Sequence, residues 1–439
     1  MTDALTTPRT AAELAAATPA GRDRYADLLR LYSIGMVVLG HWVVALLTVH
    51  GAGSVTTSLP LALSTWVWQV MGLFFFVGGF AHARALNKPN AGHRPRTADF
   101  ARARAYRLLP PALVLLAVWS VLALLMHAAG LTDGVFAVGL QLITIPLWFL
   151  GVYLVIVLAA PAMMRLHLRY GTWPVVAALA VAVAAVDAVR LATGVMQIGL
   201  ANLLFVWLAV HQLGFGYADG TLLRGGRRTA GLLAAGGLAG AALLVFGTSA
   251  YPVLMVGLPG NEVSNTAPPT LALLAQSFFL VGTALLLRGA GTALVARPKA
   301  WFAVATGNSM IMTVFCWHLT ACYLVQGALL VAGVELPAAD TPLWFAALAG
   351  WLAACSLACA GLVALFVRFE RSAGAPGAGP VSTRATVAGV LAAAAGMYAV
   401  SQAGLDGLVT AHGLPGAGVA PLVLVAAGAW ALRRRNPVT

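Results

Sequence analysis

The segment LLRLYSIGMVVLGHWVVALLTV, residues 28–49, decides the class of fold. It is long enough to cross a bilayer as one α-helix, and its side chains that can carry a charge near neutral pH are Arg30 and His41. The polar, Ala-rich residues 1–27 before it do not have the pattern of a cleavable signal, and we expect them to form a cytoplasmic N-terminal segment. The segment therefore predicts an integral membrane protein.

The composition of the whole chain agrees with this prediction. Apolar residues make up 61% of the 439 residues and charged residues 9%, whereas a soluble domain is about a quarter charged. The formal net charge of +13 would suggest nucleic acid as a partner for a soluble protein. In a membrane protein it is typical of cytoplasmic loops, so we expect the lipid bilayer as a partner and no nucleic acid.

Hydropathy divides the chain into apolar segments long enough to span the membrane. We interpret them as an all-α polytopic fold with twelve transmembrane helices. The predicted helices are 28–49, 61–83, 108–128, 135–163, 173–192, 199–218, 229–248, 268–287, 304–331, 342–367, 384–402 and 415–432.

The positions of the basic residues set the orientation. With the N-terminus inside, 25 of the 26 Lys and Arg residues fall in inner segments, and only Arg190 is left for the far side. Basic residues concentrate on the cytoplasmic side of membrane proteins. We therefore expect both termini in the cytoplasm and a location in the cytoplasmic (plasma) membrane.

The predicted helix 135–163 is too long for one perpendicular crossing, and Pro146 interrupts it. The alternation of inner and outer loops allows only one crossing here. We expect residues 147–163 to span the membrane and residues 135–145 to lie at the outer surface or to re-enter.

A Gly, Pro and Ala linker, SAGAPGAGPVS, occupies residues 372–382. We place its boundaries at 372–383, between a ten-helix core (28–371) and an additional helix pair (384–439) that ends in three arginines. The spans of this pair contain almost no ionisable groups, so a packing role is the simplest interpretation.

Arg30 and His41 are 11 positions apart in the first helix. This spacing places them about 16 Å apart along nearly the same face, with Arg30 at the cytoplasmic rim and His41 deep in the membrane. An imidazole can act as a general base near neutral pH, and the guanidinium can hold an anion. The alternative is a snorkelling arginine and a histidine hydrogen-bonded to a neighbouring helix.

Five motifs follow one another along residues 23–370. They are DLLRLYSIGMVVLGHW (27–42), GLFFFVGGF (72–80), FARARAYRLLPP (100–111), PLWFLGVYL (146–154) and GNSMIMTVFCWH (307–318). Together and in this order, they resemble the acyltransferase type 3 family of membrane enzymes, whose first helix contains an arginine, ten residues and a histidine. The final helix pair lies outside the resemblance.

The resemblance implies transfer of an acyl group, expected to be acetyl, from acyl-coenzyme A to a hydroxyl of a sugar, lipid or secondary metabolite. Acyl-CoA is then a cosubstrate, and no permanently bound cofactor is expected. The phosphates of coenzyme A need a cationic cytoplasmic face, for which the candidates are Arg84, Arg104, Arg107 and, through its motif, Trp148. The alternatives are that the arginines only keep their loop on the cytoplasmic side and that Trp148 anchors its helix at the membrane interface.

Other ionisable residues in the predicted spans have two interpretations each. The resemblance places His318 near the active cavity, as a catalytic helper or as a packed histidine. His82 and His211 lie near inner helix ends, where a structural role is favoured. Asp187 and Arg190 could pair on one helix face, and they could contact an acceptor or hold the helices together.

Several other classes of function are disfavoured. The four cysteines lie in apolar stretches without metal-ligand spacing, so no metal site is expected, and no phosphate-binding loop or serine-hydrolase motif is present. A secondary transporter that uses the same buried charges is the main alternative to an acyltransferase. A structural scaffold is a third possibility, and it would leave His41 without a role.

Overall fold

The computed structural model describes residues 10–48, 58–87, 97–131, 134–257, 264–337, 341–371, 382–408, 416 and 418–433. Within these ranges the chain forms helices and no β-strand. The helices are α1 (Ala11–Ala17), α2 (Arg24–Thr48), α3 (Leu59–Trp68), α4 (Met71–Leu86), α5 (Thr97–Ala128), α6 (Val135–Leu142), α7 (Leu147–Tyr170), α8 (Thr172–Thr193), η1 (Met196–Ala201), α9 (Asn202–Ala218), α10 (Thr221–Arg224), α11 (Gly226–Gly247), α12 (Leu271–Ala296), α13 (Pro298–Ser309), α14 (Ile311–Val331), α15 (Pro342–Arg371), α16 (Thr383–Ala403), η2 (Asp406–Leu408) and α17 (Val419–Arg433).

The predicted all-α polytopic fold is confirmed. In the described ranges, 11 segments are long and apolar enough to cross a membrane, and α17 is a shorter apolar helix of 15 residues. Each predicted span has a counterpart among these helices, but the predicted helix 304–331 is divided at Met310 between α13 and α14. The count of twelve crossings and the cytoplasmic position of both termini stay predictions.

The predicted interruption at Pro146 is present as a break between α6 and α7. Helix α6 ends at Leu142, and α7 begins at Leu147 directly after the proline. Proline is common at the start of a helix because the N–H group that it lacks would have no partner within the helix there. Helix α7 continues to Tyr170, beyond the predicted end at residue 163.

A second break, between α3 and α4, falls inside the predicted helix 61–83. The side chain of Gln69 accepts a hydrogen bond from Met71 N at 3.1 Å. The buried Gln276 of α12 donates to the carbonyls of Trp66 and Gln69 at 2.7 and 3.0 Å. Two buried amides therefore satisfy backbone groups that the break would otherwise leave without partners, as a non-aqueous environment requires.

The helices form two compact units. The first contains Met1–Val37, Thr57–Ala83 and Tyr170–Ile311, and the second contains Val38–Thr56, Arg84–Arg169 and Met312–Thr439. Helix α2 begins in the first unit and ends in the second.

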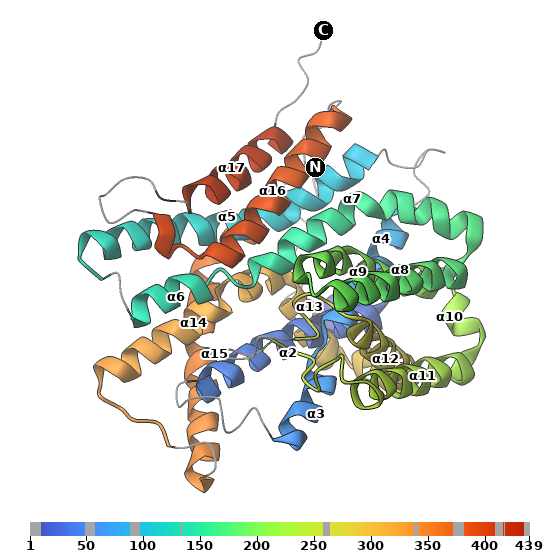
Figure 1. Ribbon diagram of the computed structural model, residues 1–439, viewed down its shortest axis with the longest axis horizontal. Helices are drawn as coiled ribbons and strands as arrows, with labels where there is room; N and C mark the ends of the chain where they lie inside the picture. Colours follow the sequence, from blue (N-terminus) through green and yellow to red (C-terminus); the bar gives the residue numbers. More distant parts are fainter. Residues whose placement is uncertain are drawn as a thin grey trace. The chain divides into compact units, whose positions relative to one another are not determined.

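Small residues bring helix backbones together in the first unit. A Cβ atom added at Gly237 of α11 would meet the backbone of α12, and one at Gly282 of α12 would meet the backbone of α11. Likewise, a Cβ atom added at Gly79 of α4 would meet the backbone of α9, and one at Gly214 of α9 would meet the backbone of α4. Figure 1 shows α11 and α12 side by side, as these close approaches require.

The final helix pair packs within the second unit. Figure 1 shows α16 and α17 side by side, next to α5. Arg102 of α5 donates from Nε to the carbonyl of Leu432 in α17 at 2.9 Å, and Thr144 donates to the carbonyl of Val400 in α16 at 3.1 Å. The pair is thus bonded to α5 and to the turn between α6 and α7, all in its own unit. The predicted linker lies almost entirely outside the described residues, and the predicted domain boundaries stay predictions.

Candidate functional site

Helix α14, which carries His318, has its first turn fixed by a carboxylate. The backbone N–H groups of Met312 and Thr313 donate to Glu370 of α15 at 3.3 and 2.8 Å, and the Thr313 hydroxyl donates to it at 2.6 Å. The first N–H groups of a helix have no partner within the helix, and negative charge is favourable there. Glu370 therefore anchors the start of the helix that presents His318.

His41 and His318 meet in the second unit. Nδ1 of His41 lies 2.9 Å from Nε2 of His318, and the two ring centroids are 5.1 Å apart. His318 is fully buried, and His41 is partly buried. The sequence indicated both residues separately, and the structure brings them into hydrogen-bond contact.

Two tryptophans hold the backbone around this pair. Trp42 donates from Nε1 to the carbonyl of His318 at 2.8 Å, and Trp351 of α15 donates to the carbonyl of Trp42 at 2.9 Å. Sequence reasoning assigned no role to either tryptophan, although Trp42 directly follows His41. The bonds link α2, α14 and α15 at the level of the two histidines.

Phe315 connects the histidine pair with α7. Its carbonyl lies 2.7 Å from Nδ1 of His318, and its ring contacts Phe149, with 5.4 Å between centroids. Trp148, the predicted donor-binding residue, is partly buried and contacts Phe149, with 6.2 Å between centroids. The Trp-Phe motif therefore lies next to the His318 turn through Phe149.

Arg30 belongs to the part of α2 in the first unit. It lies 3.7 Å from the carboxylate of Asp27, whereas Arg22 binds the same carboxylate at 2.7 Å. The Arg30 side chain is 31% exposed. Arg30 is thus only loosely held by its neighbour, and its guanidinium is accessible to an anion.

The predicted donor-binding arginines differ in exposure. Arg84 of α4 and Arg107 of α5 are exposed, and Arg104 of α5 is partly buried with its guanidinium over the ring of Phe100 at 5.1 Å. Arg102, on the same helix, is buried against α17. Donor binding by Arg84, Arg104 and Arg107 stays a prediction.

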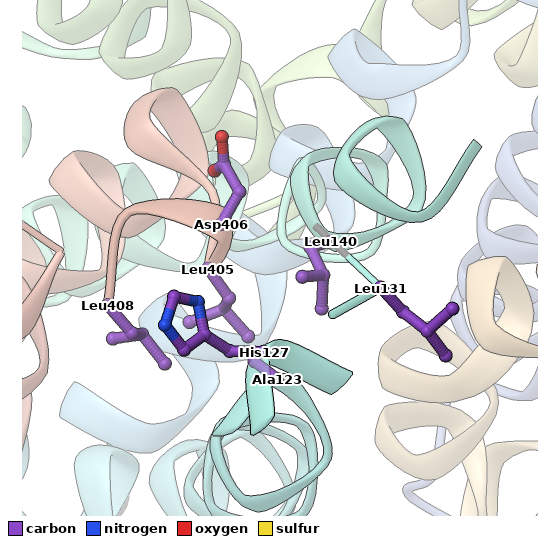
Figure 2. A pocket seen from close by; sticks show the side chains of 7 residues that line it. All are labelled: Ala123, His127, Leu131, Leu140, Leu405, Asp406 and Leu408. Atoms are coloured by element: carbon purple, nitrogen blue, oxygen red, sulfur yellow. The ribbon is translucent and has the colours of Figure 1, made fainter. Parts of the chain in front are cut away.

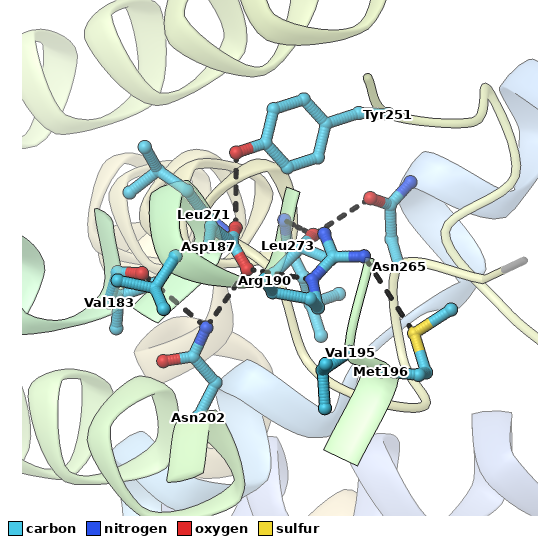
Figure 3. Close-up of polar contacts among 12 residues, drawn as sticks. Val183, Asp187, Arg190, Val195, Met196, Asn202, Tyr251, Asn265, Leu271 and Leu273 are labelled. Carbon is cyan, nitrogen blue, oxygen red and sulfur yellow. Dashed lines mark hydrogen bonds and ion pairs between the residues drawn. The ribbon is translucent and has the colours of Figure 1, made fainter. Parts of the chain in front are cut away.

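Asp187 and Arg190 form the predicted ion pair, with Arg190 Nε 3.5 Å from Asp187 Oδ1. Figure 3 shows that the Asp187 carboxylate is surrounded by donors from other segments. Oδ1 accepts from Asn202 at 3.1 Å, and Oδ2 accepts from the Tyr251 hydroxyl at 3.1 Å and from Leu271 N at 2.8 Å. The carboxylate thus joins α8, α9, the 249–257 segment and the start of α12. Contact with an acceptor stays a prediction.

Tyr251 is the donor of this cluster that lies outside the candidate membrane spans. Its burial, and to a smaller extent the charge of Asp187, raises the pKa of the Tyr251 hydroxyl above its ordinary value. Both effects disfavour the charged phenolate. Tyr251 therefore keeps its proton and remains a hydrogen-bond donor to Asp187.

His82 and His211 form a second histidine pair in the first unit. Nδ1 of His82 lies 2.9 Å from Nε2 of His211, and both rings are buried. The close backbone contact of Gly79 with His211 fixes their helices against one another. An interface or structural role for both residues stays a prediction.

A pocket of about 20 Å³ lies in the second unit between α5, α6 and the η2 segment. Figure 2 shows His127 and Leu405 among its lining residues. A cavity of this size holds about one water molecule. The pocket is therefore too small for an acyl donor or acceptor.

Comparison with known protein families finds a match over most of the chain. The family model described as an acyltransferase domain matches residues 23–366, which include all five sequence motifs. No curated protein and no solved structure matches the chain.

Proposed function

The chain belongs to the acyltransferase type 3 family, and on this premise we propose that it transfers an acyl group from acyl-coenzyme A to a hydroxyl of a carbohydrate, lipid or natural product. We assign the role of general base to His41. The observation that carries this assignment is the contact of His41 Nδ1 with His318, which leaves Nε2 of the same ring for a substrate.

The proposed reaction needs one proton acceptor and no metal ion. Nε2 of His41 takes the proton of the acceptor hydroxyl while the hydroxyl oxygen attacks the carbonyl carbon of the thioester. The C–S bond then breaks, and the thiolate of coenzyme A receives the proton from Nε2 as it leaves. The products are an ester and free coenzyme A, and His41 returns to its neutral form.

The proposed donor site uses cationic side chains of the predicted cytoplasmic face. Arg30 of the first unit is proposed separately to hold an anion, because its guanidinium is partly exposed and weakly paired. Arg84, Arg104 and Arg107 carry charges that can bind phosphate oxygens, and a guanidinium fork suits such oxygens better than an ammonium group does. Trp148 is also proposed to contact the donor. The protein is expected to act in the cytoplasmic membrane, with acetyl as the transferred group.

The proposal is tested with purified protein and radiolabelled acetyl-CoA, by following the release of free coenzyme A and the label in extracted glycans and lipids. We expect the wild-type protein to consume the thioester. His41→Gln should lower turnover about a hundred- to ten-thousand-fold with little change in donor binding, because glutamine cannot take up a proton at neutral pH.

The wild-type and variant results separate two kinds of failure. A wild-type protein that consumes no acyl-CoA with any extracted acceptor would contradict the acyltransferase proposal and favour transport. If membrane-inserted His41→Gln protein has turnover near the wild-type value, His41 is not the general base. The acyltransferase proposal itself would then still stand.

A further inference from the structure

We propose that His318 is a positioning residue that keeps the proton of His41 on Nδ1 and so leaves Nε2 as the basic nitrogen. This inference rests on the proposed function, because it specifies which nitrogen of the base acts. It also specifies the hydrogen-bond partner that selects that nitrogen.

The first step concerns the proton of His318. Its Nδ1 lies 2.7 Å from the carbonyl oxygen of Phe315. A carbonyl oxygen can only accept, so Nδ1 must carry the hydrogen. A neutral imidazole has one N–H group, and Nε2 of His318 is therefore a hydrogen-bond acceptor.

His318 is neutral because its surroundings do not stabilise a charge. The side chain is fully buried, and its ring nitrogens contact the neutral backbone groups of Phe315 and Val314 and the ring of His41. A buried imidazolium requires a counter-ion or a comparable set of acceptors. None of these partners carries a negative charge.

The second step follows for His41. Its Nδ1 is 2.9 Å from the acceptor nitrogen of His318, so Nδ1 must be the donor. Neutral His41 then has its lone pair on Nε2, which is the form that a general base needs. The hydrogen bond of one ring to a backbone carbonyl thus determines the tautomer of the next ring.

The third step is the placement of the acceptor nitrogen. His318 is held through its own backbone carbonyl by Trp42, the residue that follows His41. Trp351 holds Trp42 in turn. When Nε2 of His41 gains a proton, the Nδ1–H bond to His318 remains and stabilises the imidazolium. A fixed partner on the second nitrogen orients a catalytic histidine in the same way in other enzymes.

The test compares two uncharged replacements of His318 that differ in hydrogen bonding. His318→Gln can still place an acceptor near the Nε2 position, whereas His318→Leu cannot. We expect turnover of the Gln variant within about tenfold of wild type. Turnover of the Leu variant should fall about a hundred- to ten-thousand-fold, as for the loss of a general base, and KM for acetyl-CoA should remain unchanged in both.

His211 provides a matched control, because it is a fully buried histidine with a histidine partner at the same 2.9 Å distance. Turnover of His211→Gln and His211→Leu should not differ by the large factor expected between the two His318 variants at constant KM. Equal turnover of the two His318 variants, whether high or low, would overturn the inference. So would a loss of turnover that is accompanied by a raised KM, since that indicates general distortion. His41→Gln in the same assay tests the base itself, independently of His318.

Discussion

Three arginines of α5 lie close in sequence but in different surroundings. Arg102 is buried and donates to the carbonyl of Leu432, whereas Arg104 is partly buried and Arg107 is exposed. Charge alone therefore does not decide their roles. Substituting each of the three in turn distinguishes a role in donor binding from a role in packing, within one helix.

We expect Arg104→Ala and Arg107→Ala to raise KM for acetyl-CoA about ten- to a hundredfold, because each loses a charge-assisted bond to phosphate. Lysine at either position should rescue only partly, since it lacks the guanidinium fork. Arg102→Ala should leave KM unchanged and lower the thermal stability. Steady-state kinetics give KM for acetyl-CoA, and thermal unfolding gives the stability of each variant. If KM is the same in all variants, Arg104 and Arg107 do not bind the donor.

At the scale of elements, the packing of α16 on α17 depends on glycine. A Cβ atom at Gly428 of α17 would meet the backbone of Gly389 and Ala393 in α16. Gly361 of α15 has nothing within 4 Å of such an atom. The two glycines are therefore a matched pair for testing whether close contact or helix propensity matters.

We expect Gly428→Val to lower the free energy of unfolding by about 1–3 kcal/mol, because overpacking forces the two helices apart. Gly361→Val should be neutral or slightly stabilising. Thermal unfolding in detergent measures both. A smaller effect at Gly428 than at Gly361 would contradict the close packing of the final pair.

Sequence reasoning identified the helices and the Pro146 break because both depend on local composition. It missed the break between α3 and α4, although Gln69 stands out in an apolar run. The partner that stabilises this break, Gln276, is 207 residues away. The contact between His41 and His318 was not predicted for the same reason, since the two residues are 277 positions apart and no periodicity relates them. Only the family resemblance placed His318 near the active cavity.

For the whole molecule, orientation in the membrane can be tested with cysteine labelling. The four native cysteines, Cys316, Cys322, Cys355 and Cys359, are free and buried, so their background should be low. Asp99 and Glu335 are exposed and lie on opposite sides of the predicted topology. Ala98, a neighbouring position, is buried and unsuitable.

We expect a membrane-impermeant maleimide to label Glu335→Cys in intact cells. Asp99→Cys should be labelled only after permeabilisation, because the basic segment 84–107 remains in the cytoplasm. Mass spectrometry or gel shift reports the modification. Labelling of Asp99→Cys from outside would overturn the predicted orientation.

The bond between Arg102 and Leu432 also has a consequence for biosynthesis. The two residues are 330 positions apart, so at usual rates of translation the ribosome adds Leu432 about 15 to 65 seconds after Arg102. During this interval the nascent chain has a cationic side chain at a helix face that α17 has not yet covered. A translation product that stops before Leu432 therefore keeps that face of α5 without the hydrogen bond that the finished protein makes there.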